Sequence, residues 1–434
     1  MLGDMNPFRL AGNINFVTVL EKEGKTMLEN FIKNSWDKCI RYQPEDDGTL
    51  IGLPKPYTVP CIEERFQEMY YWDTYFTNLG LLCSNRVEQA KNNAENMSFL
   101  IHKYGFMPNG NRTWYLTRSQ PPFFSKTVRD IFDITNDKDW LNEMYPALIK
   151  EYNFFKNSRM LPSGLFRYYG NPQSADAIEI IASKFAKRVG ITLNGSNQNR
   201  EKYAYAHYAL CESGWDCNSR FGVVNSAEFS WIDLNSLIYG MLTDLTYFAE
   251  ILQNGEDKHW QRKAEQLQNL ICEKCYDDEK GMFCDYDLVN EKKSNFLSLA
   301  CFYPLYVGLS NAEQAEKTIK HLIELEQEFG VACCPDRDDL HSLQWDYPIG
   351  WACLHQIVVK SLLNYGYKSD AHRIAKKFCK LIETNYAKTG NLWEKYNVVT
   401  GGLAQVNESH NSHMMGWTAG CYLYCLEICK NLEA

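Results

Sequence analysis

Two short segments in the first third of the chain, residues 65–75 and 108–122, each combine aromatic rings with carboxylates, arginines and amides. Aromatic rings stack on the apolar faces of a sugar, while charged and amide groups form paired hydrogen bonds with its hydroxyls. A core segment would not tolerate so many polar groups without partners. The pattern therefore favours a carbohydrate site over the alternative of two aromatic-rich surface loops.

Five later segments share this character: residues 212–220, 231–235, 344–348, 393–397 and 407–417. In four of the seven segments a Trp directly precedes an acid, as Trp72-Asp73, Trp215-Asp216, Trp345-Asp346 and Trp393-Glu394. An indole beside a carboxyl group excludes water and raises its pKa, which keeps the acid protonated near neutral pH. A single pair is more simply an Asp that caps a helix beside a packed Trp. Four pairs together favour acid–base chemistry.

Hydrolysis of a glycosidic bond needs two carboxyl groups, placed on opposite sides of the scissile carbon. These segments offer at least six candidate acids, and their residues alone do not select two. A metal site is a weaker alternative. His410 and His413 could bind a metal with Glu408, but an i, i+3 pair in a polar loop falls short of the four ligands of a closed site.

The elements that position these segments are predicted to be helices. Apolar residues recur at helical spacing over 87–104, and Gly105 follows as a stop. A capping box at Ser310 begins a helix that continues to residue 329, and Asp233 caps one that continues to residue 252. Further helices are expected over 348–365 and from Ser369 onward. Strand patterns are few and short.

No linker or shift of composition divides the chain, so a single all-α domain is expected. Helices joined by motif-bearing loops fit a barrel of helical hairpins in two layers. A helical repeat solenoid is the alternative, but the sequence has no fixed period.

Composition limits the classes of partner. The net charge of −9 and the lack of a basic stripe argue against nucleic acid. No run of about 18 apolar residues predicts a membrane span. We expect no secretory signal, because Asp4 interrupts the first residues and the apolar run 16–20 is too short. The 16 cysteines are therefore interpreted as reduced thiols in a cytoplasmic protein.

The motifs together resemble one family, the trehalases of glycoside hydrolase family 37. Residues 65–75 resemble its first signature and residues 344–351 its second, and the segments 108–112, 118–122, 212–220 and 394–396 match in the family's order. The resemblance covers roughly residues 50–425. It implies an (α/α)6 barrel over residues 1–434 with residues 1–50 as an N-terminal helical extension. It also implies an inverting mechanism on α,α-trehalose or a related α-glucoside, without metal or organic cofactor.

The resemblance also implies residue roles. Asp216 would be the general acid that protonates the glycosidic oxygen, and Glu394 the general base that activates water. Glu408, in the last loop, would contact substrate, although a solvated loop acid is the alternative. The sugar subsites would be lined by Arg65, Phe66, Tyr70, Trp72, Asp73, Asn109, Arg118, Gln120, Trp215, Gln344 and Trp345.

The chain departs from the family pattern at four places. Residues 62–64 replace Pro-Gly-Gly, and residues 171–174 (Asn-Pro-Gln-Ser) replace Arg-Pro-Glu-Ser. The segment from there to Asp216 is longer, and the lid at residues 401–415 lacks the usual glycine run. Loss of a charged hydrogen bond from the missing arginine would weaken binding by about 1.5–3 kcal/mol. We therefore expect glucose or a close relative at the cleavage subsite, with the leaving group left open.

Two alternatives follow from these departures. One is a related hydrolase whose substrate is a glucosyl-glycerate type glycoside or another α-linked disaccharide. The other is a non-catalytic sugar-binding protein on the same scaffold. Such a protein would usually have lost the acid or the base, whereas Asp216 and Glu394 are both present. The sequence does not give the oligomeric state.

Overall fold

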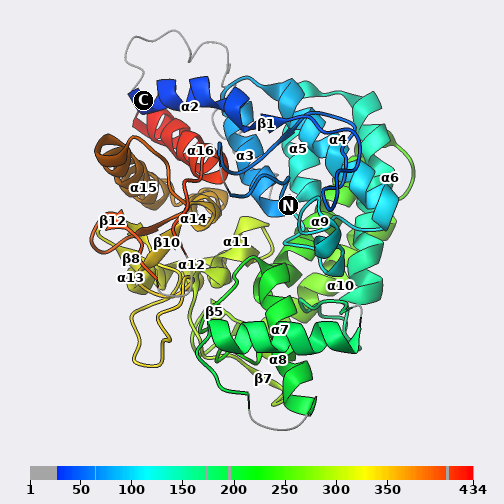
Figure 1. Cartoon of the computed structure of the whole chain (residues 1–434), viewed down its shortest axis with the longest axis vertical. Helices are drawn as coiled ribbons and strands as arrows, with labels where there is room; N and C mark the ends of the chain where they lie inside the picture. Colours follow the sequence, from blue (N-terminus) through cyan, green and yellow to red (C-terminus); the bar gives the residue numbers. More distant parts are fainter. Residues whose placement is uncertain (1–26, 64, 173, 194–196, 407–409, 434) are drawn as a thin grey trace.

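Six helices form a closed inner ring in the computed structural model of the protein, which describes residues 27–433 except 64, 173, 194–196 and 407–409. They are α3 (Tyr71–Cys83), α5 (Phe124–Thr135), α9 (Ile232–Leu252), α11 (Tyr303–Tyr306), α14 (Ala352–Asn364) and α16 (Gly416–Glu433). Each contacts the next, and α16 returns to pack along α3 (Figure 1). This closed order is the inner layer of an (α/α)6 barrel and confirms the predicted fold class.

A second layer of helices surrounds the ring. It consists of α4 (Val87–Tyr104), α6 (Lys138–Ser158), α10 (Asp257–Cys275), α12 (Ala312–Lys320) and α15 (Lys368–Thr389), with α2 (Met27–Ser35) beside α16. The sequence of each layer explains its place. In α3 every residue from Tyr71 to Leu82 is buried, as an inner helix requires, whereas α10 buries one stripe. That stripe is Trp260, Ala264, Leu267, Ile271 and Cys275.

Two further helices, α7 (Ala175–Arg188) and α8 (Asn197–Ser213), pack on each other at one side of the barrel (Figure 1). They occupy the segment before Asp216 that is predicted to be longer than the family pattern. Its helix α7 begins where the Ser174 side chain accepts from the backbone N–H of Ala177. The chain between residue 174 and Asp216 is therefore mostly helical.

The remaining elements are short. The strands are β1 (Ile40–Arg41), β2 (Tyr57–Thr58), β3 (Phe229–Ser230), β4 (Tyr276–Asp277), β5 (Met282–Phe283), β6 (Tyr286–Asp287), β7 (Lys292–Lys293), β8 (Glu326–Gln327), β9 (Gly330–Val331), β10 (Ile349–Trp351), β11 (Lys395–Asn397) and β12 (Gly402–Leu403). Single turns are η2 (Trp36–Cys39), η3 (Thr113–Thr117), η4 (Ser226–Glu228), η5 (Leu299–Phe302) and α13 (Leu322–Leu325). The antiparallel sheet β10-β11-β12 matters most for the site, because it places Trp351 opposite Lys395.

The predicted helix 87–104 is confirmed to the residue, with Gly105 in the left-handed region at φ 87°. The predicted helix 310–329 was wrong in two respects. Its capping box is formed by Asn311 and Gln314, and the helix ends at Lys320. Residues 326–327 instead pair with β9. The predicted helix 348–365 begins only at Ala352, because residues 349–351 form β10.

Candidate active site

A cavity of about 370 Å³ opens among the segments that precede the inner helices and the first turns of those helices, with α7 and α8 at one side. Twelve of the fourteen predicted site residues line it: Arg65, Phe66, Tyr70, Trp72, Asp73, Asn109, Arg118, Gln120, Asp216, Gln344, Trp345 and Glu394. These residues come from segments up to 329 positions apart, between Arg65 and Glu394. The fold therefore brings the predicted motifs into one place.

A cluster of five buried tryptophans forms one wall of the site. Trp345 stacks on Trp351 with ring centroids 3.9 Å apart and on Trp215 at 5.2 Å. Trp72 and Trp417 pack against this stack at centroid distances between 5.6 and 5.9 Å. All but Trp215 line the cavity. Such a wall offers flat apolar surface to a sugar ring and holds its own shape by ring contacts.

One glycine allows the cluster to meet the Asp216 loop. Gly214 has φ 74°, and a Cβ placed there would lie 2.5 Å from the Trp72 ring. Any side chain would therefore displace the ring, and the left-handed backbone also favours glycine. This explains why the Glu-Ser-Gly-Trp-Asp motif, residues 212–216, carries a glycine at its centre.

The candidate acid and the candidate base are joined by a chain of hydrogen bonds. Gln344 donates from Nε2 to Oδ2 of Asp216 at 3.0 Å. Its Oε1 accepts from Nζ of Lys395 at 3.3 Å, and the same Nζ lies 2.8 Å from Oε2 of Glu394. Gln344 thus contacts one carboxyl directly through its amide N–H and the other indirectly through Lys395.

The lid segment holds Glu394 and Lys395 in place. The backbone N–H of Glu394 donates to the carbonyl of Ser412 at 2.9 Å. Asn411 accepts from the backbone N–H of Lys395 and donates to its carbonyl, and Lys395 Nζ donates to the carbonyl of His410 at 3.0 Å. Residues 410–412 therefore position the candidate base through contacts with its backbone and with Lys395.

Burial acts on the acids that face the cavity. Burial is the main cause that raises the pKa of Asp73 to about 7; the neighbouring Glu394 and Asp216 carboxyls add to this rise, and a backbone hydrogen bond opposes it. Burial also raises the pKa of Glu394, while Lys395 opposes this rise. The charges of these three carboxyls therefore interact in one cavity.

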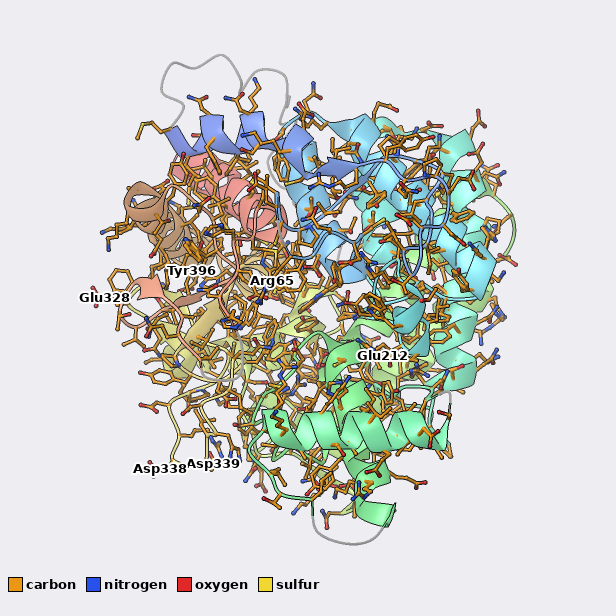
Figure 2. All side chains as sticks on the ribbon, viewed as in Figure 1. Arg65, Glu212, Glu328, Asp338, Asp339 and Tyr396 are labelled. Atoms are coloured by element: carbon orange, nitrogen blue, oxygen red, sulfur yellow. The ribbon has the colours of Figure 1, made fainter. Side chains whose placement is uncertain are left out.

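The other motif acids are structural. Both oxygens of Glu212 accept from Arg159, at 2.7 Å each, and also from the backbone N–H groups of Ser119 and Tyr169. Asp346 accepts from Ser219 and from the backbone N–H of Leu343. Figure 2 places Glu212 inside the molecule, whereas Asp338 and Asp339 project from its edge. Burial raises the pKa of Asp346, yet it does not line the cavity.

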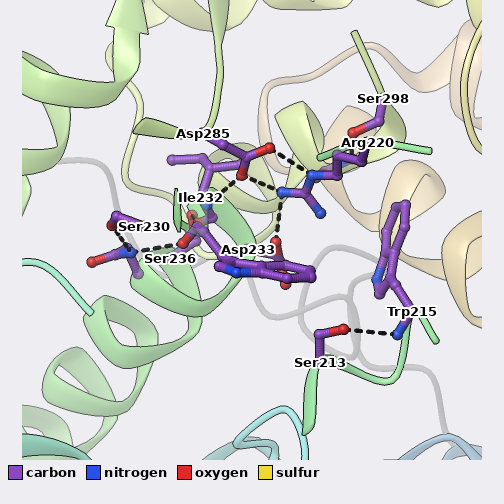
Figure 3. A network of polar contacts seen from close by, with 12 residues as sticks. Ser213, Trp215, Arg220, Ser230, Ile232, Asp233, Ser236, Asp285 and Ser298 are labelled. Carbon is purple, nitrogen blue, oxygen red and sulfur yellow. Dashed lines mark hydrogen bonds and ion pairs between the residues drawn. The ribbon is translucent and has the colours of Figure 1, made fainter. Parts of the chain in front are cut away.

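A buried charge network lies beside Trp215 (Figure 3). Arg220 donates from Nε to Asp285 at 2.6 Å and from Nη2 to Asp233 at 2.8 Å. Its guanidinium carbon lies 5.2 Å from the centroid of the Trp215 ring. Asp233 was predicted to cap a helix; α9 instead begins at Ile232, and the Asp233 side chain binds Arg220.

Two of the fourteen predicted site residues, Trp215 and Glu408, are not among the described residues that line the cavity. Trp215 stacks on Trp345 and does not line the cavity, so its sugar contact stays a prediction. Glu408 lies outside the described residues, as do Glu64 and Gln173 of the segments that depart from the family pattern.

The two lid histidines lie in different places. His410 lines the cavity, whereas the ring of His413 packs on Trp393 with centroids 4.4 Å apart. Within the described part of the chain, no group of three His, Cys, Asp or Glu side chains is placed to hold a metal.

Sequence reasoning missed eight lining residues: Tyr115, Arg188, Cys211, Gly214, Trp351, Ser412, Met414 and Trp417; it named His410, a ninth, only as a possible metal ligand or partner of the leaving group. Trp351 and Trp417 stood within recognised motif segments, so their aromatic character was a usable signal. Arg188 stood in none, and only the course of α7 brings its Nη2 to 2.9 Å from Oδ2 of Asp216.

Comparison with known proteins agrees with this geometry. The family model described as trehalase matches residues 6–430. The chain belongs to the trehalase family. It is 32% identical over 472 aligned residues to a periplasmic trehalase of Escherichia coli O1:K1, covering 97% of this chain and 80% of that protein. It is 31% identical to the periplasmic trehalase of Shigella flexneri serotype 5b, with the same coverage.

Comparison with solved structures agrees with the family and with the fold. The neutral trehalase Nth1 from Saccharomyces cerevisiae superposes with a TM-score of 0.73 at 29% identity, over 93% of this chain and 80% of that one. A mannosylglycerate hydrolase from Thermus thermophilus has a TM-score of 0.60 at 17% identity, over 85% and 95% respectively, and so shares the fold alone. This trehalase-family chain is a glycoside hydrolase. Within its described residues no helix is long and apolar enough to cross a membrane.

Proposed function

We propose that this chain hydrolyses α,α-trehalose, or a closely related α-glucoside, with inversion at the cleaved anomeric carbon. The observation that carries the proposal is the meeting of Asp216 and Glu394 in one cavity, joined through Gln344 and Lys395. The names of the relatives supply trehalose as the first substrate to test. A glucoside with a different leaving group is the second candidate, because residues 171–174 and the lid depart from the family pattern.

In the proposed reaction Asp216 protonates the glycosidic oxygen as the bond to the anomeric carbon breaks. Glu394 takes a proton from the water that attacks the opposite face of that carbon. Asp73 and the tryptophan wall hold the cleaved sugar, with Arg65, Asn109 and Gln120 as further donors or acceptors. The environment of Glu394 supports its role as the base. Nζ of Lys395 lies 2.8 Å from its carboxyl oxygen and favours the ionised form that a general base needs.

The decisive experiment is hydrolysis of trehalose by the unmodified protein and by Asp216→Asn and Glu394→Gln. Each substitution keeps the side-chain volume, so we expect folded proteins whose turnover falls by about 10²–10⁴-fold. Proton NMR during the first turnovers should show equal α- and β-glucose, since inversion affects one of the two sugars. Two α-anomers would contradict inversion. Sugar binding without hydrolysis in the unmodified protein would leave the binding-protein alternative.

We also propose the cytoplasm as the compartment. Each of the 16 cysteines is a free thiol in the structure, which suits a reducing environment. The relatives named above are periplasmic by name, so the point needs its own test. Cell fractionation with immunodetection should find the chain with cytoplasmic markers, and recovery with the exported fraction would contradict the proposal.

A further inference from the structure

Arg188 is a cation at the cavity that no recognised motif explains. It is the last residue of α7, and its Nη2 lies 2.9 Å from Oδ2 of Asp216. Burial lowers the pKa of Arg188, but the Asp216 carboxylate and its other neighbours raise it by more, so the guanidinium stays charged. Cys211 and Cys217 are its next electrostatic neighbours, which places it on the α8 side of the cavity.

This ion pair conflicts with the proposed role of Asp216. A general acid must carry a proton when the glycosidic oxygen leaves. In the empty cavity Oδ2 of Asp216 instead accepts from both Arg188 and Gln344, at 2.9 and 3.0 Å. Two donors therefore occupy one oxygen of the carboxyl group that has to reach the glycosidic oxygen. Arg188 must therefore leave Asp216 before the reaction, and the substrate is the new partner that can draw it away.

We propose that Arg188 is a specificity-determining residue of the leaving-group half of the cavity, an inference that rests on the proposed function. It pairs with Asp216 while the cavity is empty and with oxygen acceptors of the leaving group once substrate binds. Asp216 then takes a proton from solvent and gives it to the glycosidic oxygen, while the attacking water gives its proton to Glu394. The acceptors are sugar hydroxyls or a carboxylate, which present the same oxygen chemistry to a guanidinium.

The position of Arg188 fits the leaving-group side. A general acid contacts the oxygen between the two halves of the substrate, so a side chain beside Asp216 can reach past that oxygen. The α7–α8 hairpin that carries Arg188 also begins directly after residues 171–174, where the family's arginine is absent. Its side chain is 27% exposed, so it has room to move without repacking a core.

The test uses the full chain with Arg188→Gln and Arg188→Lys, and Lys187→Gln as the matched control. Lys187 is the exposed neighbour on the same helical turn and does not line the cavity. Substrates are trehalose, an α-glucoside of glycerate, and α-glucosyl fluoride, whose leaving group is a single atom. We expect Arg188→Gln to lose about tenfold or more in kcat/KM on at least one glycoside, with less than about twofold loss on the fluoride.

Each outcome supports or overturns one claim. A larger loss on the glycerate glucoside assigns Arg188 to a carboxylate, and a larger loss on trehalose assigns it to sugar hydroxyls. Equal losses on the fluoride and the glycosides overturn the proposal. If the unmodified protein cleaves none of the three substrates, the proposed function fails, and this inference fails with it. Activity on the fluoride with no effect of Arg188→Gln on any glycoside overturns this inference alone.

Discussion

At the scale of residues, position at the cavity separates the candidate reactive acids from the structural ones. Glu212 accepts two bonds from Arg159 and two from backbone N–H groups, and it does not line the cavity. Asp73, Asp216 and Glu394 instead line the cavity. A Trp–acid pair in the sequence does not distinguish these cases. Trp345-Asp346 has the same pattern as Trp72-Asp73, yet Ser219 and Leu343 occupy the Asp346 carboxyl.

Lys395 is predicted to set the acidic limb of the activity profile. Its side chain is fully buried and lies 2.8 Å from Glu394, where it opposes the rise in the pKa of that carboxyl caused by burial. In Lys395→Met this opposition is lost, so the pKa of Glu394 rises further and the base is protonated over a wider range. We expect the acidic limb of kcat/KM to move to higher pH. Lys388→Met, an exposed lysine of α15, is the control. An unmoved limb would remove Glu394 from the role of base.

How far the sequence predicts the site is visible in particular residues. Asp216, Glu394 and the Trp72-Asp73 pair stand in motifs, and the structure brings all of them to the cavity. Arg188 could not be found in this way, because its contact with Asp216 depends on the length and direction of α7. Trp215 shows the opposite case: it sits in a motif but stacks on Trp345 and does not line the cavity.

At the scale of elements, one buried ion pair connects the loops on which the site depends. Glu212 lies in the last turn of α8, Arg159 follows α6, and the backbone N–H of Ser119 lies between the cavity residues Arg118 and Gln120. The carboxyl of Glu212 therefore ties two helices to the loop that presents those side chains. Both partners of the pair are buried, with side chains at most 1% exposed.

Glu212→Gln is predicted to destabilise the protein and to loosen this loop. The amide keeps the shape but leaves the buried Arg159 without a counter-ion, which costs about 3–5 kcal/mol. The matched control is Glu316→Gln, which breaks the exposed pair with Lys320 and should change stability by less than about 1 kcal/mol. Urea unfolding gives both values, and KM for the preferred substrate should rise in Glu212→Gln. Equal effects of the two substitutions would show that the buried pair does not hold the loop.

The elements also show where local sequence signals fail. Helix 87–104 ends at Gly105 as predicted, because the apolar stripe and the left-handed glycine agree. The pattern over 310–329 continues in the sequence, but residues 326–327 pair with β9 and the backbone N–H of Val331 donates to His355 at 3.0 Å. That contact joins positions 24 residues apart, and local periodicity carries no information about it.

At the scale of the whole molecule, a closed double ring buries ionisable groups between its layers. Glu151 of the outer helix α6 accepts from the hydroxyl of Tyr71 in α3, and that hydroxyl accepts from the backbone N–H of Phe124 at the start of α5. Burial raises the pKa of Glu151 to about 8, although the Tyr71 hydrogen bond opposes the rise. Burial also raises the pKa of Asp130 to about 7. Folding therefore favours the protonated forms of these acids.

This burial predicts a stability that falls as the pH rises. Because the pKa of Glu151 is higher in the folded state than in the unfolded state, the stability it contributes is fully present below about pH 4.5 and is lost as the pH rises towards 8. In Glu151→Gln no proton is exchanged at this position, and the amide oxygen still accepts from Tyr71. Between about pH 5 and 8 the unmodified protein should therefore lose about 3 kcal/mol more stability than Glu151→Gln. Urea midpoints measured across this range test the difference, with Glu316→Gln as the exposed control. Parallel curves for the unmodified protein and Glu151→Gln would mean that Glu151 stays ionised in the folded barrel.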